Sequence, residues 1–184
     1  MRLYNRHSLR AGFGGQIKMI ETEVITEAIL ENKRWLYNLA YSITRDPEDA
    51  KDAVGNAIVK AYVNKDSIKK KDSINAWLYR IVNNEAYNIL RKKKHELSLD
   101  EVDEDVCAED EIENYIGEMN IWNIVLQMPE KYRAIICLFY GRDMDIKTIH
   151  KITGIPIGTV KSRLNRAREF LRARLEEGGD YHAI

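Results

Sequence analysis

The chain has 184 residues, of which 45% are hydrophobic, and its 29 basic residues balance its 29 acidic ones. This length suits one domain or two small ones, and no apolar run reaches the roughly 18–20 residues that a membrane-spanning helix needs. The neutral total hides a pattern, because residues 1–95 carry 18 bases and 11 acids, residues 96–113 carry ten acids and no base, and residues 114–184 carry 11 bases and 8 acids. Neutrality therefore does not exclude a polyanionic partner, since local charge clusters decide which surfaces attract one.

Residues 1–20 start with scattered arginines and include a glycine cluster, GFGG at 12–15, that would interrupt a helix. They lack the apolar core of a signal peptide. We expect a disordered basic tail, or an upstream start with Met19 as the natural beginning.

The two cysteines show no pairing logic, which favours a reducing cytoplasm. Cys107 lies in the acidic stretch, and Cys137 lies in the apolar run AIICLFY, where a small core residue is the simplest interpretation. The four histidines are scattered, and none has the spacing of a metal ligand. The sequence therefore predicts neither a metal site nor a cofactor, and it contains no nucleophile–base pair or phosphate loop that would indicate an enzyme.

Residues 21–95 predict a first helical domain. One helical stripe is formed by Trp35, Leu36, Leu39, Ala40 and Ile43. Asp46 is expected to cap the next helix, with Pro47 at its first position. A polar loop at 64–73 then leads to a third helix from Ala76 to about Lys93, and no alternating strand pattern occurs in the sequence.

The third helix has two chemically different faces. The face expected to be buried carries Leu78, Val82, Ala86 and Ile89. The opposite face carries aromatic, amide and arginine side chains, namely Trp77, Arg80, Asn84, Tyr87, Asn88 and Arg91. Such side chains suit unpaired bases, because aromatics stack on bases, amides read base edges and arginines hold phosphates. A mixed face packed against another helix explains the pattern equally well.

Residues 96–115 form the expected linker. High charge and few large apolar residues leave too little burial to offset the entropy cost of ordering. A solvated, flexible acidic spacer is the simplest interpretation. The alternative is that its acids shield a basic DNA-binding face when no DNA is bound.

Residues 116–177 predict a second helical domain, followed by a tail at 178–184. Its helices are expected near 116–127, 130–141, 145–152 and 157–176. Ile146, Ile149 and Ile152 recur every three residues and define one buried face. Gly154 can take the positive φ of a sharp turn, and Pro156 fits the first turn of the helix that follows.

The last helix combines a buried back with a polar front. Its inner stripe is Val160, Leu164, Ala167, Leu171 and Leu175. The front carries Ser162, Asn165 and Arg166, with Thr159, Lys161 and Arg163 on the flanks. Six bases and one acid lie between residues 161 and 174. A helix-turn-helix needs such a second helix to lie in a DNA major groove, although a solvated amphipathic helix is the alternative.

These segments resemble a known family. Residues 128–169 resemble region four of bacterial sigma factors. They contain a Tyr-Arg pair at 132–133, the helix-turn-helix, and Gly-Thr-Val-Lys-Ser-Arg at 158–163. The Leu-Pro pair that begins this region in the family is Met128-Pro129 here. The segment NAWLYRIVNNEAYNILRKKK (75–94) resembles region two. A chain in which an acidic linker joins region two directly to region four, without a region three, is typical of the extracytoplasmic-function class of the sigma-70 family. The resemblance implies an all-α fold of two small helical domains.

The resemblance also implies roles for the two polar helix faces. The residues expected to bind and melt the minus-ten promoter element are Trp77, Arg80, Asn84, Tyr87, Asn88, Arg91 and Lys92. The residues expected to read the minus-thirty-five element are Thr159, Lys161, Ser162, Arg163, Asn165 and Arg166. The loop at 67–73 would form the wall of the pocket that holds a flipped base.

The segment RDPEDAKDAVGNAIVKAY (45–62) resembles the helix that docks on the clamp helices of the polymerase β′ subunit. Asp49, Asp52 and Asn56 would make that contact. The family commonly has Gln-Glu where this chain has Gly55-Asn56. This departure removes a carboxylate and places glycine inside a helix, where it costs about 1 kcal/mol relative to alanine.

The partners that the resemblance implies are RNA polymerase core, through the β′ clamp helices and the β flap, promoter DNA and an anti-sigma factor, with no small-molecule substrate. The implied function is promoter-specific initiation of transcription in the cytoplasm. Two alternatives are a degenerate sigma-like factor that acts by sequestration and a helix-turn-helix regulator that binds duplex DNA without initiating.

Overall fold

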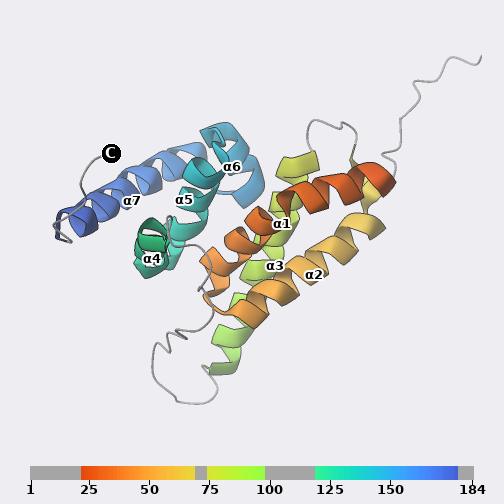
Figure 1. Ribbon diagram of the computed structural model, residues 1–184, viewed down its shortest axis with the longest axis horizontal. Helices are drawn as coiled ribbons and strands as arrows, with labels where there is room; N and C mark the ends of the chain where they lie inside the picture. The colour runs from red at the N-terminus through yellow and green to blue at the C-terminus, as the bar shows by residue number, and fades with distance from the viewer. Residues whose placement is uncertain (1–21, 69–73, 98–118, 178–184) are drawn as a thin grey trace, which may run out of the picture.

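The computed structural model describes residues 22–68, 74–97 and 119–177, and every regular element in these ranges is a helix. The first half, on the right in Figure 1, contains α1 (Thr22–Thr44), α2 (Pro47–Val63), the short 3-10 turn η1 (Lys65–Ser67) and α3 (Ile74–Leu97). The second half contains α4 (Met119–Gln127), α5 (Glu130–Arg142), α6 (Ile146–Thr153) and α7 (Ile157–Glu177). The predicted all-α fold with two helical blocks is confirmed.

Several sequence-based expectations lie outside the described residues. They are the tails at 1–20 and 178–184, most of the linker at 96–115 with Cys107, and the part of the polar loop at 69–73. α3 continues to Leu97, slightly into the expected linker. Within the described ranges, none of the helices has both the length and the apolar character needed to cross a bilayer.

The start of α2 is built as its sequence predicts. Asp46 has extended backbone angles, and its carboxylate accepts hydrogen bonds from the amides of Glu48 at 2.9 Å and Asp49 at 3.0 Å. Lys93 near the end of α3 donates to Asp46 at 3.3 Å and to Asp49 at 3.0 Å. The Asp49 amide, aided by Lys93, holds the pKa of Asp46 below its ordinary value. One carboxylate therefore both caps α2 and ties it to α3.

The helix-turn-helix is held by its caps. Asp145 accepts from the Thr148 amide at 2.6 Å at the start of α6, and Gly154 ends that helix with φ of 72°. A ring nitrogen of His150 lies 2.7 Å from the Ile155 carbonyl and bridges the turn. Ile149 and Ile152 are buried as predicted.

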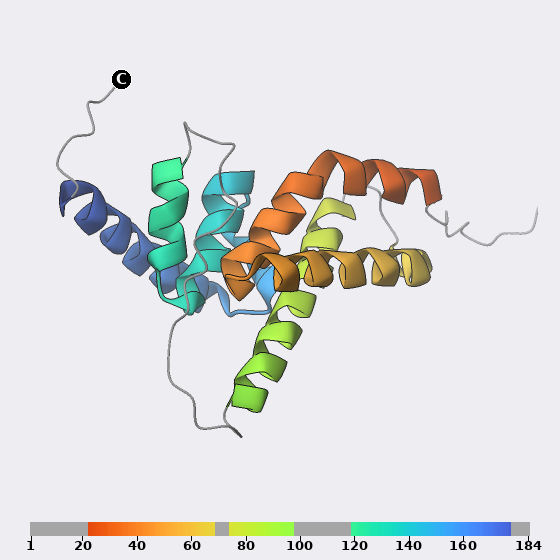
Figure 2. The same ribbon diagram turned by 60° about the horizontal axis from the view of Figure 1, so that its bottom comes forward.

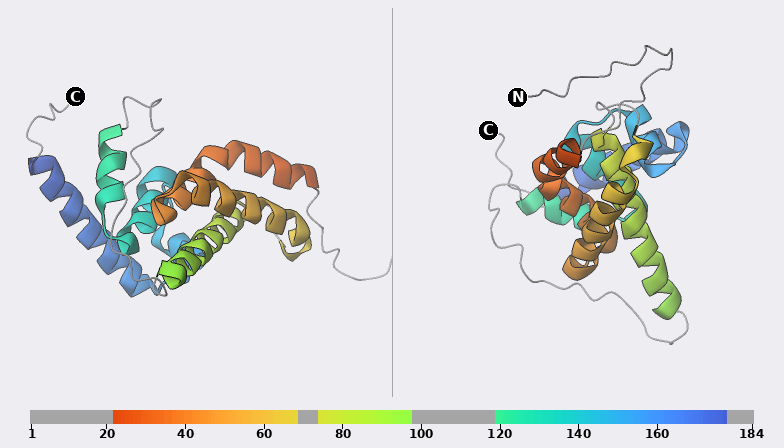
Figure 3. Two further views of the ribbon diagram at one scale, coloured as in Figure 1. Left: turned by 90° about the horizontal axis from the view of Figure 1, so that it is seen from below. Right: turned by 90° about the vertical axis from the view of Figure 1, so that its right-hand side faces the viewer.

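The two halves pack against each other. α5 lies along α1, α6 lies against α3, and α7 packs on α5 and α6 (Figure 3). The last turns of α3 project beyond this bundle in Figure 2. The buried side chains form one continuous cluster from α1 to α7. Sequence periodicity did not predict this contact, because it shows which helix face is buried but not what covers it.

Replacement of Asp46 tests the cap of α2. Asp46→Ala should lower the free energy of unfolding by about 0.5–2 kcal/mol, whereas Asp46→Asn should retain most of the stability because asparagine caps helices equally well. Urea denaturation at neutral pH measures both. Because the folded-state pKa is lowered, the contribution is present above the ordinary carboxyl pKa, and it should disappear as pH falls through the folded-state value. Equal stability of the wild type and Asp46→Ala at neutral pH would contradict this role.

Candidate nucleic-acid interface

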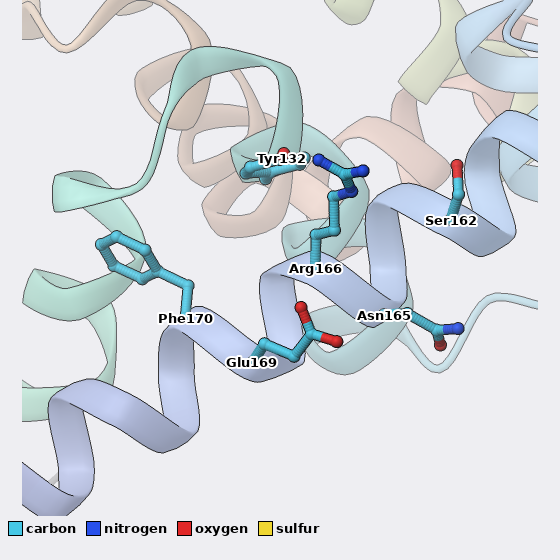
Figure 4. A pocket seen from close by; sticks show the side chains of 6 residues that line it. All are labelled: Tyr132, Ser162, Asn165, Arg166, Glu169 and Phe170. Carbon is cyan, nitrogen blue, oxygen red and sulfur yellow. The ribbon is translucent and has the colours of Figure 1, made fainter.

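The back of α7 is buried and its front is open, as the sequence predicts. Val160, Leu164 and Ala167 are at most 2% exposed, whereas Lys161 and Arg166 are exposed. A shallow pocket runs along the front and is shown in Figure 4. Its lining residues are Tyr132, Ser162, Asn165, Arg166, Glu169 and Phe170.

Three members of this pocket, Tyr132, Glu169 and Phe170, were not predicted from the sequence. Glu169 lies one turn beyond Arg166 and places a carboxylate among donors, and such a group accepts hydrogen bonds from the amino group of cytosine. Glu169 lies four positions after Asn165, and this spacing could have predicted from the sequence that both lie on the same face of the helix. Tyr132 comes from α5, and the Arg166 side chain extends toward it in Figure 4. Only the tertiary structure brings Tyr132 to the front of α7.

The flanks of α7 differ from each other. Lys161 is exposed, whereas Thr159 and Arg163 are half-buried. The Arg163 guanidinium donates to the Lys131 carbonyl of α5 at 3.4 Å. Arg163 therefore lies against the body of the second half, and Lys161 is the more open cation.

The polar face of α3 is only partly open. Arg80, Asn84, Arg91 and Lys92 are exposed, and Trp77 and Asn88 are half-buried. Arg91 donates to the Asn88 side-chain oxygen at 2.6 Å, and the Asn88 amide lies 3.4 Å from Glu85. Asn88 is thus held within a polar network, and Asn84 presents the more accessible amide.

Tyr87 differs from the other residues of this predicted face. It is half-buried, and burial together with the Glu130 carboxylate raises its pKa, while Arg163 and Arg133 act in the opposite direction. All three charged neighbours belong to the second half. The sequence placed Tyr87 on the open face with Trp77 and Asn84, but in the structure Tyr87 is partly buried against the core and within electrostatic range of these charges. Helix periodicity could not predict this, because it does not show which other helices lie nearby.

The residues predicted to contact polymerase lie along α2. Asp52 and Asn56 are exposed, whereas Asp49 is half-buried and paired with Lys93. Val59 and Val63 continue the same strip at 63% and 74% exposure, and the sequence interpretation overlooked both. Counted from Asp52, Asn56 lies at i+4, Val59 at i+7 and Val63 at i+11, which places all four on one side of the helix. The strip therefore combines a carboxylate, an amide and two apolar side chains.

Within the described residues, no group of three or more histidine, cysteine or carboxylate side chains is placed to hold a metal ion.

Comparison with known proteins agrees with this geometry. Residues 28–96 match the family model of sigma-70 region 2, and residues 118–171 match that of sigma-70 region 4. The extracytoplasmic-function RNA polymerase sigma factor SigW of Bacillus subtilis is 31% identical over 176 residues, which cover 88% of this chain and 94% of SigW. The chain belongs to the sigma-70 family. RNA polymerase sigma factor SigV of the same organism is 28% identical over 158 residues, with 86% and 95% covered.

The family assignment identifies the chain as a sigma factor of the extracytoplasmic-function class, that is, a DNA-binding initiation factor for transcription. Sigma factors are generally not enzymes. The predicted resemblance is confirmed.

Solved structures resemble the complete two-half arrangement. The sigma factor RpoE in a co-crystal with the anti-sigma factor NepR from Bartonella quintana has a TM-score of 0.72 and 25% identity, and the match covers 84% of this chain and 98% of RpoE. CnrH, solved in complex with the cytosolic domain of CnrY, has a TM-score of 0.60 at 20% identity and supports the fold.

Two substitutions on α7 distinguish a base contact from a phosphate contact. Arg166→Ala should relax preference at one or two positions of the upstream element, because a good bidentate base contact is worth about 1–3 kcal/mol of discrimination. Lys161→Ala should weaken binding evenly across sequences and reduce the salt slope by about one. Holoenzyme binding to a library of single-base-pair promoter variants, measured at several salt concentrations, checks both. Equal, sequence-blind losses from the two substitutions would refute the assigned roles.

Proposed function

We propose that this sigma factor delivers RNA polymerase core to promoters, reads the minus-thirty-five element with the front of α7 and holds the opened minus-ten element on the exposed face of α3. One observation carries the proposal. The same chain presents a helix-turn-helix that suits duplex DNA and, on a separate helix, exposed amide and guanidinium groups that suit an unpaired strand.

The face of α3 has the chemistry that strand opening requires. Removal of a base from the stack costs a few kcal/mol, which contacts to the extruded base must offset. Asn84 supplies an exposed amide for a base edge, and the guanidinium groups of Arg80 and Arg91 suit the phosphates on either side. Trp77 and Asn88 border this strip and are half-buried.

The front of α7 has the chemistry that duplex recognition requires. Ser162, Asn165, Arg166 and Glu169 all line one shallow pocket on this front. Arginine recognises guanine, asparagine recognises adenine and glutamate accepts from cytosine in the major groove. The exposed ammonium group of Lys161 suits a contact with a DNA phosphate. Such a contact fixes the register of the helix on the duplex but does not distinguish base sequence.

The exposed strip of α2 is proposed as the contact for the β′ clamp helices. Asp52 supplies charge for a basic surface, and Val59 and Val63 supply apolar area that would be removed from water. Asn56 lies between them. Asp49 contributes less in this state, because Lys93 already holds its carboxylate at 3.0 Å. The second half is proposed to contact the β flap, as its resemblance to region four implies.

An anti-sigma factor is the proposed regulator. RpoE and CnrH are both described in complexes, with the anti-sigma factor NepR and with the cytosolic domain of CnrY. We propose that this chain has a partner of the same kind, that it acts in the cytoplasm beside polymerase, and that it catalyses no reaction itself.

The two rival functions make different demands on the structure. A regulator that binds only duplex DNA has no use for the exposed amide and arginines of α3. A degenerate factor that sequesters a partner is favoured by Gly55-Asn56, where the family commonly has a docking carboxylate. Gly55 has open space around its α-carbon, so nothing in the fold requires glycine at this position.

Substitution of Asn84 tests the role in strand opening. Asn84→Ala should reduce run-off transcription from a duplex promoter far more than from a template already mismatched across the minus-ten region, because the mismatch supplies the unpairing energy in advance. Asn38→Ala, the same change on α1 outside both proposed DNA faces, is the control. The ratio of duplex to premelted transcription is measured for each variant, together with its melting temperature. An unchanged ratio in folded Asn84→Ala would remove the melting role from this face.

Charge reversal on α2 tests the polymerase contact. Asp52→Lys should sharply weaken binding to core polymerase, whereas Glu31→Lys, the same change on an exposed part of α1, should not. Asp52 is a cleaner choice than Asp49, because reversal of Asp49 also breaks the pair with Lys93.

A double substitution that restores the Gln-Glu pair common in the family also tests the polymerase contact. Gly55→Gln with Asn56→Glu should tighten core binding, because the change removes a helix-interior glycine and adds a carboxylate where the structure has room. Titration of labelled core measures affinity, and circular dichroism confirms helicity. If the restored variant binds no better than the wild type, the Gly55-Asn56 departure does not weaken docking.

A further inference from the structure

A buried carboxylate lies on α3 between α2 and the polar face. Glu85 is 8% exposed, and a glutamate is seldom buried unless its charge is paired. Its Oε1 atom accepts from the Lys60 ammonium of α2 at 2.6 Å. The same oxygen accepts from the Asn88 side-chain amide at 3.4 Å. The contact with Lys60 explains why Glu85 can be buried, whereas the contact with Asn88 connects it to the face proposed to bind DNA.

The amide of Asn88 lies between an acceptor and a donor. Its nitrogen donates to Glu85, and its oxygen accepts from an amino group of the Arg91 guanidinium at 2.6 Å. A carboxylate only accepts hydrogen bonds, and a guanidinium only donates them. The flipped amide would place its oxygen against the carboxylate and its nitrogen against the guanidinium. Glu85 and Arg91 therefore permit one orientation of the Asn88 amide.

Two hydrogen bonds hold the Arg91 side chain on the surface of the helix. The first is the bond to Asn88, and in the second the Arg91 Nε donates to the Tyr87 carbonyl at 3.3 Å. The side chain is nevertheless exposed, and an exposed arginine ordinarily has much rotamer freedom. Its other N–H groups take no part in these two bonds. A guanidinium that is already oriented loses less conformational entropy when it binds a phosphate.

The spacing of these residues explains how they act together. Glu85, Asn88 and Arg91 follow one another at intervals of three, so their side chains form a row along α3. The row begins at the ion pair with Lys60 of α2 and ends at an exposed cation. Asn84 lies one turn before Asn88 and is exposed. The two asparagines therefore differ in their surroundings, although their chemistry is the same.

We propose that Glu85 is a positioning residue for DNA binding, because it orients the Asn88 amide, which in turn orients the Arg91 guanidinium toward one phosphate of the opened strand. Asn88 thus adds affinity without reading a base, and Asn84 is the amide that reads a base edge. The orientation of Arg91 stands on the hydrogen bonds alone. Its use on DNA rests on the function proposed above.

The order of the Arg91 side chain in the free, full-length protein tests the orientation. The heteronuclear NOE of an arginine Nε–Hε group reports its motion on the ps–ns timescale, and Arg91→Lys identifies the signal of Arg91 by removing it. Asn88→Ala and Glu85→Met should each lower this NOE. The NOE of Arg80, an exposed arginine of the same helix outside the row, should not change. An unchanged NOE of Arg91 in folded Asn88→Ala overturns the proposal.

Glu85→Met is suited to this test. Methionine has a similar helix propensity, and the Lys60 side chain is 51% exposed, so its ammonium can be solvated when the carboxylate is removed. Circular dichroism and the melting temperature show whether the variant is folded. If Glu85→Met does not fold, Glu85→Leu decides the question by the same NOE.

A second substitution distinguishes orientation from general stability. A carboxylate at position 88 presents an acceptor oxygen on either side, so it needs no neighbour to orient it. Asn88→Asp added to Glu85→Met should therefore restore the NOE of Arg91 to near the wild-type value, with the total charge of the row unchanged. If Arg91 stays as mobile in the double variant as in Glu85→Met alone, Glu85 does not act by orienting the amide.

Binding of the holoenzyme to the template mismatched across the minus-ten region tests the use of Arg91 on DNA. Arg91→Ala should weaken binding several-fold and reduce the salt slope by about one. Asn88→Ala should weaken binding by no more than this, and equally for templates that differ at single mismatched bases. Asn88→Ala added to Arg91→Ala should cause no further loss, because both substitutions remove the same contact.

The outcomes separate the two levels of the proposal. If Asn88→Ala changes the preference at one base, or if the losses from Asn88→Ala and Arg91→Ala multiply, Asn88 reads DNA directly and its positioning role is overturned. If Arg91→Ala leaves template binding unchanged while the NOE still depends on Glu85 and Asn88, the function proposed for Arg91 fails, and the orientation of its side chain by Glu85 stands.

Discussion

The guanidinium of Arg133 sets the relation between the two halves. A buried charge is costly unless hydrogen bonds satisfy it, and Arg133 finds its acceptors at the end of α1 and at Met128. Those acceptors fix where α5 lies on α1. Because α6 and α7 are packed on α5, the position of α5 on α1 also brings α6 against α3.

Charge in this chain works locally. The total is neutral, yet Lys93 neutralises two carboxylates at the start of α2, and Lys94 joins α3 to Glu130 in the other half. Neighbouring lysines thus make different contacts. Lys93 joins two helices of the first half, and Lys94 joins the first half to the second. The cations left at the exposed end of α3 and along α7 are those that a phosphate backbone can reach.

The interface between the halves combines a continuous apolar cluster with a few buried polar contacts from Arg133 and Arg142. The buried thiol of Cys137 is part of this cluster. Burial raises its pKa to about 12, with Ser42 of α1 beside it, so it packs at the interface and stays protonated.

The sequence by itself determined the helices, their caps and the buried side of each, because these depend on residues within a few positions of one another. Asp46, Asp145, Gly154 and the stripe from Val160 to Ala167 all act through such local spacing. The same spacing, read with the family motifs, identified the class of protein and the open front of α7.

Only the tertiary structure decided what covers each helix. Tyr87 fits the polar face of α3 by periodicity, yet it is partly buried against the core, and Tyr132 lines the α7 pocket from a different helix. The neighbouring residues Tyr132 and Arg133 likewise have different surroundings. Tyr132 lines the α7 pocket, whereas Arg133 donates a hydrogen bond to the Ser42 carbonyl of α1. Gly141 shows the reason most directly. Its neighbour Trp35 lies more than a hundred positions earlier, and no local pattern records a contact between surfaces that meet only when the chain has folded.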